Sequence, residues 1–346
     1  MQKSELGRSG IQVSRLCLGT MTFGRQNTEA DAFRQLDMAL DAGIDFVDTA
    51  EMYAFPADPR TQGLTETYIG NWMKARGTRN RVTVATKITG PGDRFEHIRG
   101  GTLRYTADQI AAAVDGSLNR LGTDVIDLYQ LHWPERQANY FGRLDYRHAR
   151  NQSWTPLEVT LEALGREVER GRIRAVGVSN ETPWGLMKFL ALSEAMNLPR
   201  VAAIQNPYSL LCRTFEIGLA EIAIRERCGL LAYSPLSFGA LTGKYLNGAR
   251  PAGSRLALFP AFGRYVKPLA QTATAEYVAI AKKFGLDPAQ MAIAFVLSRP
   301  FLTSAIVGAT TEAQLAANIA AAGLTLAPEV VEAIDAVHAS NPNPAP

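Results

Sequence analysis

Four side chains that can hold or move a proton stand at the ends of apolar, strand-like segments in the first half of the chain. Asp48 follows IDFV, Tyr53 lies just beyond it, Lys87 closes VTVAT, and His132 follows VIDLYQL. Buried strands normally give way to turn residues such as Gly, Asn or Ser. If one barrel or sheet edge gathers these four groups, they would form a proton-transfer site centred on a tyrosine.

Tyrosine is a poor proton donor near neutrality, because its ordinary pKa is about 10. A neighbouring cation stabilises the phenolate and lowers that pKa, and Lys87 could supply the charge while Asp48 keeps the ammonium protonated. His132 could hydrogen-bond a substrate oxygen. The set suits protonation of a carbonyl oxygen while a hydride arrives at the carbon. Taken singly, each residue has an ordinary structural alternative as a cap, an anchor, a solvated lysine or a core imidazole.

Eight short apolar segments alternate with helical patterns along the chain. Continuous apolar runs are typical of parallel strands that are buried on both faces. The expected strands cover residues 15–19, 45–48, 82–87, 125–132, 173–180, 202–206, 230–235 and 304–308. Eight strand–helix units predict an α/β fold of the (β/α)8 TIM-barrel type. A doubly wound Rossmann sheet is the alternative, but no GxGxxG follows an early strand.

Capping signals mark where some of the helices begin. Thr28 with Asp31 and Thr106 with Gln109 predict two capping boxes, each followed by a helix. Further helices are expected at 157–169, 183–195, 215–227, 272–283, 311–320 and 328–339.

We expect one barrel domain over residues 1–346, although the length alone would also allow two domains. It would consist of an N-terminal β-hairpin at about 1–14, the barrel at about 15–322, and a C-terminal helix and tail at about 323–346. Two long segments, 133–155 and 237–271, interrupt the alternating pattern. In a barrel both would lie as loops on the C-terminal face, where barrel enzymes build their active sites.

The composition is that of a globular protein without a strongly charged surface. The chain has 47% hydrophobic residues, 20% charged residues and a net charge of +3, so we do not expect nucleic acid or an anionic membrane as its main partner. Cys17, Cys212 and Cys228 include no CxxC pair, which argues against a disulfide framework or a zinc site. No metal is expected, because HExxH and paired Cys/His spacings are absent. The lack of a signal-peptide core or a long apolar stretch favours a cytoplasmic protein.

Ordered motifs along nearly the whole chain resemble those of the aldo-keto reductase superfamily. They are DTAEMY (48–53), the lysine that ends VTVATK, LYQLHWP (128–134), GVSNE (177–181), QNPYS (205–209), YSPLSFGALTGKY (233–245) and VGATTEAQLAANI (307–319). Together with EMYAFPADPRTQGLTETYIGNW and the closing PNPAP, they resemble most the bacterial Tas-type reductases. The resemblance implies that the four strand-end residues form a catalytic tetrad in which Tyr53 is the general acid in reduction.

The resemblance also implies a nicotinamide dinucleotide, with NADP(H) preferred and NAD(H) possible. The ring of Tyr233 would stack on the nicotinamide, and Ser179, Asn180 and Gln205 would hold its carboxamide. Lys244 is expected to bind phosphate. The other implied cofactor-binding residues are Gly19, Thr20, Met21, Asp48, Ser234, Pro235, Leu236, Gly239, Leu241, Arg255, Gly308, Thr310, Gln314 and Asn318.

The last motif departs from the family pattern. Many members have a basic residue there that binds the adenosine 2′-phosphate, whereas GATTEAQLAAN contains no Lys or Arg. Ala317 also replaces an acidic residue that often precedes the final Asn. A threonine hydroxyl and Arg255 can still bind a phosphate, so NADPH is preferred and use of both cofactors stays open.

The favoured function is an NADPH-dependent reductase of aldehydes or activated ketones, with a small-molecule carbonyl compound as its partner. Substrate contacts are expected from Met21, Phe55, Trp133, Tyr140 and Trp154. The alternative is an NADP(H)-binding regulatory subunit that resembles the potassium-channel β subunits of the same superfamily. A Schiff-base lyase is disfavoured, because Asp48 would keep Lys87 charged. The sequence does not fix the oligomeric state, for which a monomer is slightly favoured.

Overall fold

The computed structural model describes residues 1–346, with a closed barrel of eight parallel strands at its centre. The barrel strands are β3 (Leu16–Gly19), β4 (Phe46–Asp48), β5 (Thr83–Ile88), β6 (Ile126–Leu131), β7 (Ile173–Ser179), β8 (Val201–Pro207), β9 (Gly229–Tyr233) and β10 (Leu302–Val307). They pair in chain order, and β10 pairs with β3 to close the circle. All eight expected strands are present, so the TIM-barrel prediction is confirmed.

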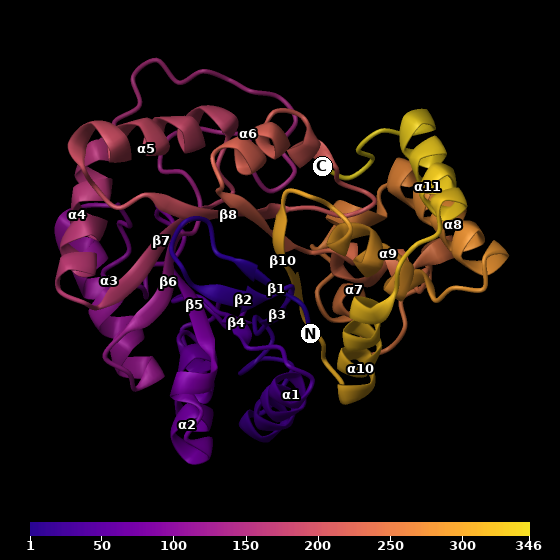
Figure 1. Cartoon of the computed structure of the whole chain (residues 1–346), viewed down its shortest axis with the longest axis horizontal. Helices are drawn as coiled ribbons and strands as arrows, with labels where there is room; N and C mark the ends of the chain where they lie inside the picture. The colour runs from indigo at the N-terminus through magenta and orange to yellow at the C-terminus, as the bar shows by residue number, and fades with distance from the viewer.

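Helices surround the strands on the outside (Figure 1). The longer ones are α1 (Glu29–Asp41), α2 (Leu64–Arg76), α3 (Ala107–Leu121), α4 (Leu157–Glu169), α5 (Pro183–Met196), α6 (Leu219–Arg225), α8 (Pro268–Lys283), α9 (Pro288–Leu297), α10 (Glu312–Ala320) and α11 (Pro328–Ser340). Their inner faces and the outward-facing strand residues form the main hydrophobic core. No single helix has the length and apolarity to cross a membrane. Only Glu312–Gly323 taken together with Pro328–Ser340 meets that test, and this pair is bent by 113°.

Some helices differ from the sequence expectation. The patterns do not predict α2, whose buried face includes the polar Glu66, nor α9, which is buried on nearly all sides and so shows no polar stripe. The helix expected at 215–227 is split into η2 (Thr214–Glu216) and the short α6. Gly218, with φ 96°, lies between the two pieces and interrupts the helix.

One of the two predicted capping boxes is present. The Thr28 side chain accepts from the Asp31 amide, and the Asp31 side chain accepts from the Thr28 amide. The second prediction is wrong, because Thr106 makes no capping hydrogen bond. The side-chain oxygen of Gln109 instead accepts from the amide of Arg104 in the preceding loop.

The predicted N-terminal hairpin is present and fills the N-terminal end of the barrel. Its strands are β1 (Lys3–Glu5) and β2 (Gln12–Ser14), which pair antiparallel. Leu6 and Val13 are buried against interior barrel residues that include Cys17 and Phe46. The Ser14 amide also donates to Oδ1 of Asp45, just before β4. With this end closed, the opposite, C-terminal end is the one available for a site.

The two long segments contribute loops to the C-terminal face. Residues 133–155 contain no helix or strand. The second segment, expected at 237–271, contains only short helical pieces up to residue 267, namely η3 (Ser237–Thr242), η4 (Leu246–Gly248), α7 (Arg255–Leu258) and η5 (Gly263–Val266), and its last four residues already belong to α8. The C-terminal tail contacts the second of these segments, since Arg264 Nε donates to the carbonyl of Pro346, and Ala345 donates to the carbonyl of Leu211 after β8.

Candidate active site

The four strand-end residues lie together at the C-terminal end of the barrel. Asp48 is the last residue of β4, Lys87 lies near the end of β5, and His132 follows β6. These three strands are parallel neighbours, so their ends open on the same face. Tyr53 lies in the loop after β4 and is half-buried, whereas the other three side chains are buried.

Lys87 and Asp48 form a buried ion pair. Lys87 Nζ lies 2.6 Å from Asp48 Oδ2 and also donates to the carbonyl of Thr49 at 2.7 Å. Burial alone would lower the pKa of Lys87, but the charge of Asp48 and the nearby Tyr53 outweigh it, and the pKa is raised. The amine therefore stays charged, which argues against a Schiff-base role for Lys87.

Tyr53 lies beside both Lys87 and His132. Lys87 Nζ is 5.1 Å from the centre of the Tyr53 ring, and the ring of His132 meets it edge-on with 5.9 Å between centres. Burial raises the pKa of Tyr53, and the charge of Lys87 opposes this effect without cancelling it. The charge of Lys87 thus lowers the pKa of Tyr53, as expected, but burial has the larger effect and the pKa of the phenol stays above its ordinary value. Tyr53 is therefore protonated at neutral pH and can donate a proton.

His132 is neutral in this environment. Burial, with a contribution from the charge of Lys87, holds its pKa well below the ordinary value of 6.5. Its Nδ1 atom is buried without a hydrogen-bond partner. A neutral imidazole has one donor and one acceptor nitrogen, and buried polar atoms are normally paired. The ring therefore has hydrogen-bonding capacity left for a bound molecule.

Gln205, at the C-terminal end of β8, is hydrogen-bonded to the ion pair. Its Nε2 atom donates to Asp48 Oδ1 at 2.8 Å, and its carbonyl accepts from Ser179 Oγ at 2.8 Å. Gln130 donates to the same Asp48 oxygen at the longer distance of 3.3 Å. Gln205 was expected only beside the cofactor, and nothing in its sequence context predicts this contact with Asp48. The two halves of the barrel face thus meet at one carboxylate.

Asn180 makes a second connection between the two halves. Its Nδ2 atom donates to the carbonyl of His132 at 2.9 Å, and its Oδ1 atom accepts from the hydroxyl of Tyr233 at 2.7 Å. Asn180 has φ 54°, a left-handed conformation that Asn tolerates better than most residues. The tyrosine expected to stack on nicotinamide is therefore fixed relative to the backbone of His132.

Residues at the end of β3 contact the backbone of Asp48 and of the loop that carries Tyr53. Thr20 Oγ1 donates to the carbonyl of Asp48 at 2.8 Å, and the carbonyl of Met21 accepts from the Phe55 amide at 3.0 Å. Gly19, the last residue of β3, pairs with Asp48 in the barrel sheet. These three residues thus lie next to the proposed tetrad.

The segment after β9, residues 236–258, carries three cations that lie in no ion pair, namely Lys244, Arg250 and Arg255; we call this segment the strap. Of the predicted cofactor residues, Ser234 and Pro235 lie between β9 and the strap, and Leu236 and Leu241 lie at the beginning of the strap, next to or within η3. A Cβ on Gly239, which has φ 86°, would lie 2.8 Å from Lys244 Nζ, so glycine permits this close approach. The Arg255 guanidinium lies 4.7 Å from the ring centre of Phe238. Burial lowers the Arg255 pKa, and no carboxylate is among the groups that act on it.

Gln314 and Asn318, two of the residues that the resemblance implies for cofactor binding, through contacts with adenine, stabilise their own turn in this structure. Gln314 accepts from the amide of Thr310 at 3.0 Å, and Asn318 donates to the carbonyl of Gly308 at 3.4 Å. Thr311, not Thr310, is the N-cap of α10. Asn318 is buried and Gln314 is exposed. Gln314 would have to release Thr310 before it could bind a base.

Aromatic side chains line the outer part of the site. Trp133, Tyr53, Phe55, Phe95 and Tyr140 belong to one apolar cluster. A Cβ on Gly90 would lie only 2.1 Å from the Trp133 indole, so a glycine is required there for the ring to fit.

The aromatic lining differs in part from the predicted substrate residues. Phe262, whose ring centre is 5.7 Å from that of Phe55, was not predicted to contribute. Trp154 packs against the main core beside α4 and does not belong to the aromatic cluster. Phe262 and Phe95 lie in irregular segments, where no periodic pattern distinguishes a lining residue from a surface residue.

The chain is similar in sequence to known proteins along nearly its whole length. The model of the Aldo/keto reductase family matches residues 15–339. The chain is 50% identical over 346 residues to Protein tas of Escherichia coli, covering all of both chains. It is 35% identical over 342 residues to the Uncharacterized oxidoreductase YrpG of Bacillus subtilis, covering 97% of this chain and 95% of that protein. A rice protein called "Probable voltage-gated potassium channel subunit beta" is 32% identical over 359 residues, covering 99% and 98%.

Proposed function

The chain belongs to the aldo/keto reductase family, and on that premise we propose that it reduces aldehyde or activated ketone carbonyls to alcohols with NADPH. The family implies an oxidoreductase that acts on small molecules. The finer assignment, to carbonyl reduction by a tyrosine acid, is supported by the arrangement of Asp48, Tyr53, Lys87 and His132.

Each of the four residues has a distinct task in this proposal. Tyr53 donates its phenolic proton to the carbonyl oxygen as that oxygen gains negative charge. Lys87 stabilises the phenolate that is left, and Asp48 keeps Lys87 charged and oriented. The neutral imidazole of His132 hydrogen-bonds the carbonyl oxygen and positions it next to the phenol.

The residues of the second half of the barrel face fit a nicotinamide dinucleotide. When bound, such a cofactor supplies a hydride to the carbonyl carbon. Tyr233 offers a ring for stacking, and Lys244 and Arg255 offer two cations without carboxylate partners for the phosphates. The hydrogen bonds from Gln205 to Asp48 and from Asn180 to the carbonyl of His132 would hold the cofactor side of the site relative to the proton donor.

The observation that carries the proposal is the buried ion pair of Lys87 with Asp48 beside a protonated Tyr53. The experiment is a matched assay of NADPH and NADH oxidation with a panel of aldehydes, diketones and quinones. We expect saturable, carbonyl-dependent oxidation that is faster with NADPH. If NADPH binds but no carbonyl compound in the panel is reduced, the proposed activity is wrong.

A regulatory NADP(H)-binding subunit is the second candidate, and the names of the potassium-channel relatives favour it. It differs from the first in a measurable way. A regulatory subunit would bind NADPH tightly but turn over slowly with every carbonyl tested. Turnover at the rates common for metabolic enzymes, which are about 1 per second or more, would exclude it as the main role.

A further inference from the structure

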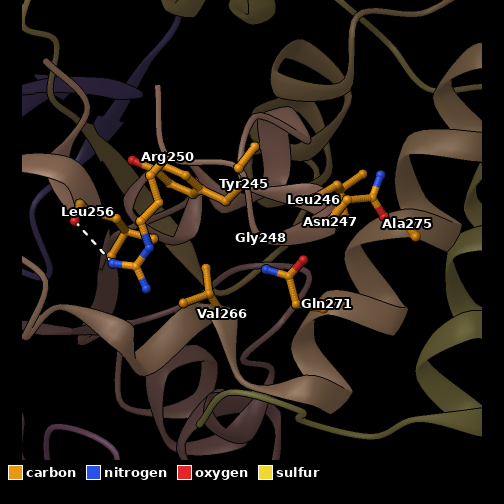
Figure 2. A pocket seen from close by; sticks show the side chains of 10 residues that line it. Tyr245, Leu246, Asn247, Gly248, Arg250, Leu256, Val266, Gln271 and Ala275 are labelled. Carbon is orange, nitrogen blue, oxygen red and sulfur yellow. Dashed lines mark hydrogen bonds between the residues drawn. The ribbon is translucent and has the colours of Figure 1, made fainter. Parts of the chain in front are cut away.

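A cavity of about 350 Å³ lies between the strap and helix α8, outside the site described above. The strap contributes Tyr245, Leu246, Arg250 and Leu256, and Gln271 comes from α8 (Figure 2). This volume is within the range of small-molecule sites, which are about 300–1,000 Å³ and mostly apolar with a few polar groups. None of the lining residues belongs to the proposed tetrad or to the residues proposed to bind the cofactor.

The polar groups of the cavity favour an anion. Arg250 is its only charged residue, and no acidic side chain lines it. The guanidinium makes one hydrogen bond, from Nη1 to the carbonyl of Leu256 at 3.3 Å, which leaves most of its donors free. Figure 2 shows the side-chain amide of Gln271 pointing into the cavity, with Val266 between it and the guanidinium of Arg250. The free donors of a guanidinium fork match the two oxygens of a carboxylate, and the Gln271 amide adds a second polar group to the same cavity.

The rest of the lining favours an apolar body on that anion. Hydrophobic residues make up the larger part of the lining, among them Leu246, Leu256, Val266 and Tyr245. One cation on a largely apolar wall fits a singly charged ligand better than a phosphate, which carries up to two charges and needs several donors. We propose that this cavity binds a small organic carboxylate with an aromatic or branched aliphatic body.

The position of the cavity would let a bound ligand influence cofactor binding. Tyr245 directly follows Lys244, and Leu256 directly follows Arg255, so two residues that line the cavity are adjacent in sequence to the two cations proposed to bind phosphate. A ligand that holds the strap against α8 restrains the movement by which the strap would release a dinucleotide. The expected effect is slower NADPH release. This effect rests on the proposed function, whereas the binding site itself does not.

The binding test uses the full chain without cofactor and benzoate as the probe, measured by calorimetry, with neutral benzamide as the comparison. We expect saturable benzoate binding that is stronger than benzamide binding. Arg250→Gln should weaken benzoate by about tenfold or more, the loss expected for a charge-assisted hydrogen bond. Arg225→Gln, which changes an exposed arginine on α6, should have no effect.

A second variant tests the location without removing the charge. Ala275→Trp places a large ring at the cavity wall on α8 and should block benzoate while the protein keeps its thermal unfolding midpoint. Absence of saturable binding, or unchanged binding in both Arg250→Gln and Ala275→Trp, would overturn the proposal. The second result would place benzoate elsewhere, for example among the aromatic residues around Tyr53.

The effect of the cavity ligand on cofactor release is tested by measuring the rate of NADPH release in a stopped-flow experiment with and without benzoate. We expect benzoate to slow release several-fold in the wild type and to leave the rate unchanged in Arg250→Gln. Benzoate binding that depends on Arg250 without any change in release would contradict the coupling alone. If NADPH did not bind at all, the proposed function would fail while the benzoate result stood independently.

Discussion

Gln205 and Asp48 are joined by a buried hydrogen bond of 2.8 Å from the Gln205 amide to Oδ1, while Lys87 holds Oδ2 of the same carboxylate. One carboxylate therefore orients the ammonium on the proton-transfer side and accepts from an amide on the proposed cofactor side. A displacement of Gln205 would shift the Asp48 carboxylate and would therefore change the position of the Lys87 ammonium. This makes Gln205 a positioning residue for the proposed reaction as well as a proposed contact of the cofactor.

Gln205→Leu should lower kcat by about tenfold or more, because a buried carboxylate oxygen loses its shorter hydrogen bond. Gln130→Leu is the matched control, since Gln130 reaches the same oxygen only at 3.3 Å and should have a smaller effect. Steady-state kinetics and NADPH fluorescence titration would separate the two roles. A variant of Gln205 with weaker NADPH binding but wild-type kcat would show that it does not act through Asp48.

The rate of reduction should be insensitive to pH across the neutral range. Burial raises the pKa of Tyr53 above its ordinary value of 10.0, so the phenol stays protonated until the pH passes that raised pKa. Lys87→Met removes the charge that opposes burial, so the alkaline fall in kcat should move to still higher pH while kcat itself decreases. A kcat profile of the wild type and the variant checks both points. An alkaline fall close to neutral pH in the wild type would contradict the assignment.

Buried His132 should make the fold less stable in acid. Its pKa is held well below 6.5, so the folded protein keeps the ring neutral while the unfolded chain takes up a proton as the pH falls below about 6.5. Stability is then lost on acidification, by at most about 1.4 kcal/mol for each pH unit from this group. Urea unfolding of His132→Gln should show a weaker loss below that pH than the wild type. His148→Gln, which changes an exposed histidine, is the control and should keep the wild-type dependence.

Arg255→Ala should weaken the binding of NADPH more than the binding of NADH, because Arg255 is the proposed contact of the 2′-phosphate and has no carboxylate partner. Loss of a charge-assisted contact predicts roughly a tenfold or larger increase in the Kd for NADPH. Dissociation constants for both cofactors, with Arg225→Ala as an exposed control, provide the measurement. Equal losses for NADPH and NADH would place Arg255 on a phosphate that both cofactors share.

The strands and the placement of the tetrad were predictable because both rest on local patterns. Continuous apolar runs identify buried parallel strands, and in a barrel Asp48, Lys87 and His132 must then open on one face. The capping box at Thr28 is equally local and is present. Helix α9 was missed because burial on nearly all sides removes the polar stripe on which helix prediction depends.

The remaining features depend on tertiary contacts that spacing does not encode. Gln109 lies three residues after Thr106, the spacing of a capping box, yet its side-chain oxygen accepts a hydrogen bond from the amide of Arg104 in the preceding loop. Trp154 and Phe262 both lie in long loops, but only Phe262 packs against Phe55. The direction of the Tyr53 pKa also could not be read from the neighbouring charges, because the effect of burial exceeds that of Lys87.

The most direct test of the central claim is the single-turnover rate of carbonyl reduction by Tyr53→Phe with NADPH bound. Phenylalanine keeps the ring beside Lys87 and His132 but removes the proton that the proposal transfers. We predict a loss of about 10²- to 10⁴-fold, the usual contribution of a general acid, with an unchanged Kd for NADPH. A rate equal to that of the wild type would contradict the assignment of Tyr53 as the proton donor.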